Sequence, residues 1–385
     1  MKINHDEKLN FNASLIFGIW KSLNSRRRYQ LFGLFVLMLL SALSEILSIS
    51  AIIPFLSTLV EPENIWKFGF LKNIANIFEI KLASQLLIPI TFFFIVAIIL
   101  ATTIRLLTLW VSNKLAASIG TDLSCKAYKR TIYQPYEVHL IRNTSSTIAT
   151  TTSHINTTVV VLNLFLQLMT SLIISISLLF FLINLNYEIA LITISIFGSA
   201  YLFLAYFSRS RLLKNSKSVA NATNKQLKSL QEGLGAIRDV LLHNSQPVYV
   251  SFYQKADKLL RQKQAESQFL SAFPRYAFES IGLIMIAIIA ITFAINSDNY
   301  SSSIPLLGTI ALGAQKLLPS LQKIYGGWAG IKARVYSVFF VLELINQPIS
   351  KRIGYSKDKK VCYSEKIQLK NVSFRYTSNS PLILK

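Results

Sequence analysis

The chain has 385 residues, of which 52% are hydrophobic and only 15% charged, and its mean hydropathy is +0.44. Soluble globular proteins carry roughly a quarter charged residues, so this composition excludes an ordinary soluble domain and favours a polytopic membrane protein. The formal net charge of +22 would also fit a nucleic-acid-binding protein. Cys125 and Cys362 belong to no Cys-x-x-Cys or Cys/His cluster, so we expect unpaired thiols on the reducing side, with no disulfide framework and no metal site.

Residues 1–28 are expected to form a cytoplasmic or interfacial N-terminal helix. The polar start lacks a signal-peptide pattern. The stretch SLIFGIWKSL places apolar side chains along one helical side, and three arginines follow it. This pattern is typical of an amphipathic helix in the membrane interface, although an ordinary helical leader to the first span is the alternative. The apolar side chains are those of Leu15, Ile16, Ile19, Trp20 and Leu23.

Six apolar runs follow, each about as long as the roughly 20 residues that cross a bilayer as a helix. The runs are continuous rather than alternating, which favours helices over the strands of a barrel. The sequence therefore predicts an all-α polytopic membrane protein with one six-helix transmembrane domain over residues 29–345. The runs cover residues 29–60, 86–111, 159–185, 189–207, 269–295 and 304 onward.

The connectors between the runs alternate in charge. Residues 184–188 and 296–303 contain no lysine or arginine, and residues 61–85 have equal numbers of both signs. The segment before the first run and the two long connectors are rich in lysine and arginine. By the positive-inside rule, both termini and both long connectors lie in the cytoplasm of a multi-pass protein of the cytoplasmic (inner) membrane. The net charge of +22 then mainly reflects the orientation of the chain in the membrane, and no nucleic-acid partner is expected.

The two long connectors each have helical periodicity on both sides of a short break, at Gln134–Pro135 in the first and at Asn244–Pro247 in the second. We expect each to form a helical hairpin that protrudes into the cytoplasm. The tip of such a hairpin offers a short, partly apolar surface to a partner. The residues predicted to couple to a partner are Tyr136, Val138 and His139 in the first hairpin, and Leu241, Leu242, Val248 and Phe252 in the second.

The C-terminal sequence KIQLKNVSFRY shows two alternating pieces around a slip of register, which predicts a bulged strand. With six spans, two intracellular helical hairpins and this strand pattern, the chain resembles the transmembrane half of a type I ABC exporter. By that resemblance, residues 346–365 are a linker and residues 366–385 are the start of an α/β nucleotide-binding domain. The resemblance also implies ATP and Mg²⁺ as cofactors, with Tyr376 stacking on the adenine.

The phosphate-loop, Walker B and signature motifs of that nucleotide-binding domain are absent from the sequence. We therefore expect the chain to be truncated within the domain and not to hydrolyse ATP alone, although the family is an ATP-hydrolysing translocase. No catalytic residue is assigned. The expected partners are membrane lipids, a second copy or a related half-transporter, and a nucleotide-binding domain from elsewhere.

Within the family, three stretches are most similar to flippases of lipid-linked oligosaccharides. They are SEILSISAIIPFLSTL with Glu45 and Pro54, FPRYAFESIG with Pro274, Arg275 and Glu279, and QKLLPSLQKI with Pro319. The resemblance implies an exporter that moves a lipid-linked or lipid-like anionic substrate, for example a polyprenyl-diphosphate oligosaccharide. The alternative is a non-catalytic remnant or regulatory membrane subunit that pairs with an intact ABC transporter. An ion-coupled secondary transporter is disfavoured because no internal repeat is evident.

Charged residues inside spans are the candidate substrate ligands. Glu45 and Arg105 lie at comparable depth, so they form either a structural ion pair or part of a cavity. Lys316 and Lys323, seven residues apart, share one helical side, either for an anionic headgroup or, for Lys323, for snorkelling to the interface. Arg275 pairs with Glu279 four residues on, or forms part of the headgroup entrance.

Overall fold

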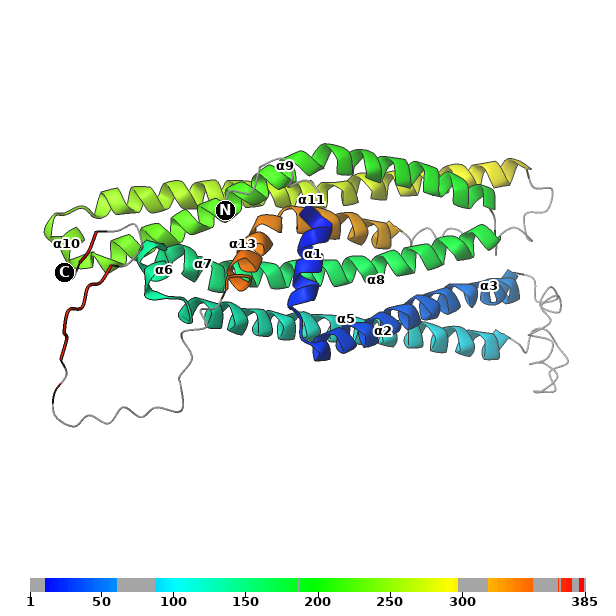
Figure 1. The fold of residues 1–385 in the computed structure, drawn as a ribbon. Helices are drawn as coiled ribbons and strands as arrows, with labels where there is room; N and C mark the ends of the chain where they lie inside the picture. The colour runs from blue at the N-terminus through cyan, green and yellow to red at the C-terminus, as the bar shows by residue number, and fades with distance from the viewer. Residues whose placement is uncertain are drawn as a thin grey trace.

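The computed structural model describes residues 11–60, 87–185, 187–296, 318–348, 366, 368–375 and 381–383. Helices account for nearly all of these residues (Figure 1). In addition to the labelled elements, residues 318–332 are helical. The elements in chain order are α1 (Phe11–Ser22), α2 (Ser25–Ser50), α3 (Ile52–Val60), α5 (Leu87–Ile132), α6 (Tyr136–Ile141), α7 (Thr144–Ala149), the π-helical turn η4 (Thr150–His154), α8 (Ile155–Leu185), α9 (Tyr187–Gly235), α10 (Ile237–Leu242), α11 (Gln246–Asn296) and α13 (Val335–Ile345).

Three segments of the described chain are helical, long and apolar enough to cross a membrane, namely Ser25–Leu59, Leu87–Ile132 and Thr144–Asn184. They match the first three predicted runs to within one residue at the ends where the runs extend further. The fourth and fifth runs lie within α9 and α11. The sixth run begins outside the described residues and continues into the helix 318–332. The described part of the chain therefore confirms a helical membrane protein.

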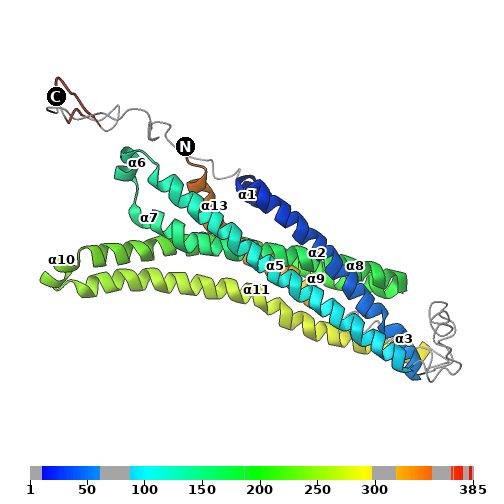
Figure 2. The same ribbon diagram turned by 90° about the horizontal axis from the view of Figure 1, so that it is seen from below.

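The two predicted helical hairpins are confirmed. α5, α9 and α11 contain 46, 49 and 51 residues. At 1.5 Å per residue they are about 70–75 Å long, more than twice the thickness of the hydrocarbon core. Figures 1 and 2 both place α6 and α10, the tips of the two hairpins, at one end of the molecule and α3 at the other. Continuous helices thus run from the apolar runs into the hairpins, namely α5 into the first hairpin and both α9 and α11 into the second.

Prolines set several of the helix ends. Pro135 is the N-cap of α6, and Pro247 lies in the first turn of α11, where a missing N–H costs nothing. Pro54 cannot donate to the carbonyl of Ser50, and the first run is accordingly broken at Ala51 between α2 and α3. The second hairpin also has a break that the sequence analysis missed, at Ala236, directly after Gly235, a residue type that weakens helices.

Pro274 lies inside α11 and removes the N–H that would bond to the carbonyl of Leu270, four residues earlier. The helix 318–332 supplies the missing donor, because the Tyr325 hydroxyl lies 3.2 Å from the Leu270 carbonyl oxygen. The same hydroxyl lies 3.1 Å from Ser208 Oγ on α9. Tyr325 is buried, so this one side chain satisfies the broken backbone ladder and ties together three helices.

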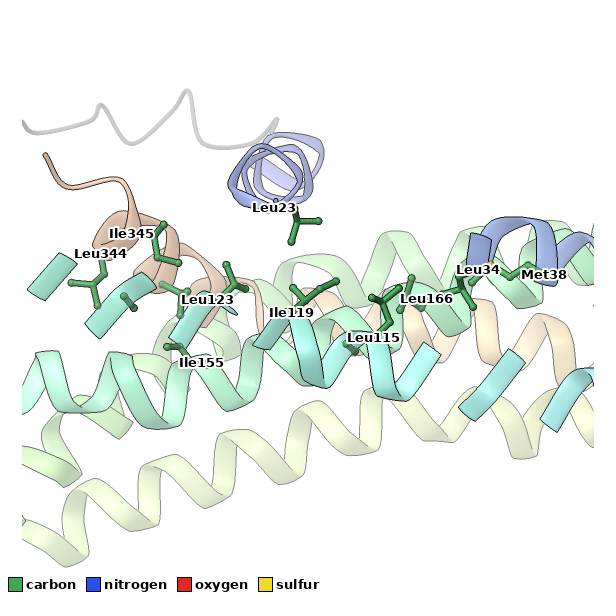
Figure 3. Close-up of a cluster of buried hydrophobic side chains, with 13 residues drawn as sticks. Leu23, Leu34, Met38, Leu115, Ile119, Leu123, Ile155, Leu166, Leu344 and Ile345 are labelled. Atoms are coloured by element: carbon green, nitrogen blue, oxygen red, sulfur yellow. The ribbon is translucent and has the colours of Figure 1, made fainter. Parts of the chain in front are cut away.

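The main apolar core lies between α2, α5, α8 and α13, with Leu23 reaching it from the turn after α1 (Figure 3). α5 and α8 come into close contact at Gly120. A Cβ atom on this glycine would lie 2.3 Å from Cγ2 of Val159 on α8. A glycine is therefore required at position 120 for α5 and α8 to pack as closely as they do.

The predicted bulged strand is not found in the described residues of the C-terminal segment. They form a single β-bridge at Phe374, whose carbonyl accepts a hydrogen bond of 2.8 Å from the Ile383 N–H. Leu369, Val372 and Phe374 are all exposed. An isolated pair of extended segments buries too little surface to form a stable sheet. Ile367 and Tyr376 lie outside the described residues.

Candidate functional site

A polar pocket of about 540 Å³ lies between α2, α5, α8 and the helix 318–332. Three charged side chains line it together with a set of hydroxyl and amide groups, whereas its remaining lining residues are apolar. The charged residues are Glu45, Arg105 and Lys323. The polar residues are Ser48, Thr102, Thr108, Ser112, Gln167, Thr170, Ser171 and Ser320.

Glu45 and Arg105 form an ion pair across α2 and α5. Arg105 Nη1 lies 3.3 Å from Glu45 Oε1. The Glu45 side chain is 7% exposed and that of Arg105 is 49% exposed, so the carboxylate is enclosed while the guanidinium opens into the pocket. The two interpretations of the sequence are therefore compatible, because Arg105 both pairs with Glu45 and lines a cavity.

The pocket has an excess of positive charge. Arg105 and Lys323 supply two cations and Glu45 supplies one carboxylate, which leaves one net positive charge among the lining residues. Lys323 is an exposed residue of the helix 318–332. A charge inside membrane helices is expensive unless it is paired or hydrated, so the cation in excess favours an anionic occupant.

The other two predicted cavity residues have separate outcomes. Arg275 is exposed on α11, as is Glu279 one turn later, and neither contributes to the pocket. Lys316 lies outside the described residues. The sequence analysis in turn missed the hydroxyl groups of α8, whose spacing alone does not distinguish a pocket from helix contacts.

The tips of the two hairpins expose apolar side chains. Tyr136, His139, Leu241, Leu242, Val248 and Phe252 are exposed, and Val138 is partly buried. Leu140 and Ile141 on α6 and Leu234 and Ile237 on the second hairpin are also exposed and were not predicted. Leu140, Ile141 and Ile237 lie in the short helices α6 and α10 that hold predicted residues, and Leu234 lies at the end of α9. Exposed apolar patches at the end of a molecule mark a surface suited to another protein.

The first hairpin also holds the residues that follow α13. Arg130 Nη1 donates to the Gln347 carbonyl, and Arg142 Nη1 lies 3.0 Å from Gln347 Oε1. Gln134 Nε2 donates to the Pro348 carbonyl at 3.0 Å. The start of the predicted linker is therefore fastened to this hairpin, an arrangement that joins residues more than 200 positions apart and has no local sequence signal.

His154 in η4 is a structural junction. Its Nδ1 lies 3.2 Å from Ser337 Oγ on α13, and its Nε2 lies 3.1 Å from Asn224 Oδ1 on α9. The side chain is 1% exposed and packs against Phe340. Because the Asn224 oxygen can only accept, Nε2 carries the proton and Nδ1 accepts from the serine. No group of three or more His, Cys, Asp and Glu suited to a metal occurs in the described part of the chain.

Comparison with known protein families identifies the family of this chain. A family model described as the ABC transporter transmembrane region matches residues 31–312, which include the pocket residues of α2, α5 and α8 and both hairpins. A search of curated proteins found no match.

Proposed function

Because the chain belongs to the ABC transporter transmembrane family, we propose that it is the membrane domain of an ATP-driven exporter that moves a lipid-linked or lipid-like anionic substrate. The pocket between α2, α5, α8 and the helix 318–332 carries this proposal. It places two cations against one carboxylate, and Glu45 and Arg105 lie on helices that can cross a membrane.

The chemistry of the pocket suits a phosphate or diphosphate group. The planar Arg105 guanidinium can donate two parallel hydrogen bonds to phosphate oxygens, and the Lys323 ammonium adds a mobile point charge. The hydroxyl groups of Thr108, Ser112 and Thr170 already donate to backbone carbonyls of their own helices, so further hydrogen bonds to the substrate would come from the other polar groups of the lining. The buried Glu45 carboxylate holds Arg105 in place and limits the excess to one positive charge. A polyprenyl-diphosphate oligosaccharide combines such a headgroup with an apolar tail.

In the proposed mechanism, nucleotide-binding domains would hold ATP and Mg²⁺, which would supply the energy of the cycle, and Tyr376 would stack on the adenine. The chain's own part is mechanical. The apolar hairpin tips dock on these domains, and the long helices carry their movement to the pocket as rigid bodies. The basic connectors support a cytoplasmic location of the tips. A second copy, or a related half-transporter, completes the cavity around the half-exposed Arg105.

The proposal predicts that the two cations contribute to ligand affinity. The purified chain is reconstituted in nanodiscs, and binding of a fluorescent polyprenyl diphosphate is measured. Arg105→Gln and Lys323→Gln are each expected to weaken binding about tenfold, because a hydrogen bond to a charged group contributes about 1.5 kcal/mol or more. Lys258→Gln, which removes an exposed cation on α11, is the control and is expected to bind as the parent does.

A neutral polyprenol of the same length distinguishes headgroup from tail recognition. It is expected to bind all four proteins weakly and equally. Unchanged affinity for the diphosphate in both Arg105→Gln and Lys323→Gln would contradict a cationic substrate site in this pocket.

A further inference from the structure

A second cavity differs from the polar pocket in the chemistry of its lining. It is an apolar groove of about 410 Å³ between α1, α2, α5 and α8, and all of its lining side chains are apolar except for the indole N–H of Trp20. On α8 it is lined by Leu166 and Met169, whereas Gln167 and Thr170 line the polar pocket. The two cavities share no lining residue, so α8 separates them and the groove is not part of the proposed substrate site.

The shape of the groove comes from the way α1 crosses the bundle. Figure 1 shows α1 running at a steep angle to the long helices. Ile19 and Leu23 are buried against the bundle, and Gly18 allows α1 to approach Leu342 of α13 closely. In Figure 3, Leu23 points toward α5, and Leu34 and Met38 continue the apolar surface along α2. The groove therefore extends from the joint between α1 and α2 along a helix that can span the membrane.

Cations of α1, α2 and α5 surround that joint, and several already have partners. Lys126 Nζ on α5 donates to the Ser22 carbonyl at 3.2 Å, and Arg28 Nη2 donates to the Trp20 carbonyl at 3.3 Å. Arg27 Nε lies 2.8 Å from Asp122 Oδ2 on α5, which fixes the start of α2. Arg28 lies with its guanidinium carbon 5.7 Å from the Trp20 ring centroid, and its Nε is buried with no hydrogen-bond partner among the described residues. Lys21 and Arg26 are exposed.

The remaining cations have no acidic neighbour within their own described helical segments. α1 contains no acidic residue, and neither does the first turn of α2. Three cations, Lys21, Arg26 and Arg28, thus adjoin a groove in which the only polar group is the Trp20 indole N–H, at the start of a membrane-spanning helix. Tryptophan and basic side chains in this position lie at the level of the lipid headgroups.

We propose that this groove is a binding site for one anionic glycerophospholipid. An acyl chain lies along the apolar side chains of α2 and α8, and the phosphate lies against Lys21, Arg26 and Arg28. The Nε of Arg28 gains an acceptor, and the Trp20 ring packs against the glycerol region. The combination of an apolar groove with uncompensated cations at one end favours a lipid over a second protein chain, which would have to supply its own acidic residues.

Fluorescence quenching by brominated lipids tests the proposal. Replacing Trp66, Trp110 and Trp328 with phenylalanine leaves Trp20 as the only tryptophan. The protein is placed in phosphatidylcholine nanodiscs that contain increasing amounts of brominated phosphatidylglycerol or brominated phosphatidylcholine. The anionic lipid is expected to quench Trp20 at least tenfold more effectively, since each cation near a membrane surface contributes roughly fivefold in affinity.

Variants distinguish the contribution of the cations to lipid binding from that of the apolar groove. Lys21→Gln combined with Arg28→Gln is expected to reduce the preference for the anionic lipid to roughly the fivefold that Arg26 alone supplies, whereas Arg28→Lys retains the full preference. Met169→Phe, which narrows the groove, is expected to reduce quenching by both lipids, and Ile176→Phe on the exposed side of α8 is the control.

Equal quenching of the parent protein by both brominated lipids would overturn the proposal, as would an undiminished preference in the double glutamine variant. Protection of Trp20 from both lipids would also overturn it, because a second protein chain would then cover the groove.

Discussion

Replacing Gly120 with leucine is expected to destabilise the protein by about 3 kcal/mol, the upper end of the usual cost of overpacking a core. A Cβ atom at this position would lie 2.3 Å from Val159 Cγ2, and valine cannot rotate away because both of its methyl groups are attached at Cβ. α5 and α8 would have to separate, which would disrupt the core between them. The measurement is the thermal unfolding midpoint of the purified protein in nanodiscs.

Gly198→Leu is the matched control. Gly198 lies in α9, and a Cβ atom there would have no neighbour within 4 Å. We expect this variant to unfold within a few degrees of the parent protein. Val159→Ala is expected to restore most of the stability lost in the milder variant Gly120→Ala. Equal midpoints for Gly120→Leu and Gly198→Leu would contradict the close helix contact.

Removing the Tyr325 hydroxyl is expected to destabilise the protein by about 2–3 kcal/mol, because Tyr325→Phe leaves the buried Leu270 carbonyl without a donor. The cost depends on Pro274. In a Pro274→Ala background the helix can supply its own N–H to Leu270, so the tyrosine hydroxyl is needed less. We therefore expect Tyr325→Phe to cost at most about half as much in that background, as measured by a double-mutant cycle on unfolding midpoints.

Additive effects of the two substitutions would show that Tyr325 does not compensate for the proline. Ser208→Ala serves as a second reference, because it removes the other hydrogen-bond partner of Tyr325 and leaves the Leu270 carbonyl satisfied. We expect it to cost less than Tyr325→Phe and to be independent of Pro274.

Much of the fold could be predicted from local features of the sequence. Continuous apolar runs predict spanning helices wherever they reach bilayer length, and Pro135 and Pro247 sit where the hairpins turn. The alternation of basic connectors predicts which helices extend beyond the membrane. Because these signals depend on periodicity and on single residue types, they can be interpreted without knowledge of the tertiary structure.

The features that sequence reasoning missed arise from contacts between distant residues. Nothing near Gln347 indicates that Arg130 and Arg142 hold it. The pairing of Tyr325 with Leu270 depends on where two helices cross. The C-terminal alternation was interpreted as a strand, but a strand requires neighbours to pair with, and the described residues there form one bridge only.

Part of the candidate site could also be predicted from single residues of the sequence. Charges within apolar runs are conspicuous, so Glu45, Arg105 and Lys323 could be named from the sequence, and the structure brings them into one pocket. Arg275 is equally conspicuous in the sequence but lies on an exposed side of α11. Which face of a helix lines a cavity is decided by packing, and the sequence of one helix does not contain that information.

The central claim is that the long helices link a pocket in the membrane to hairpin tips in the cytoplasm. Labelling of single cysteines with a membrane-impermeant maleimide tests it, after Cys125 and Cys362 have been replaced with serine. Val248→Cys, in the first turn of α11 next to α10, marks a hairpin tip, and Leu59→Cys, near the end of α3, marks the opposite end; both side chains are exposed. Figures 1 and 2 show α10 and α3 at opposite ends of the molecule. With the cytoplasmic membrane intact, we expect labelling of Leu59→Cys and none of Val248→Cys until the membrane is permeabilised. Labelling of Val248→Cys from outside the intact membrane would contradict the account.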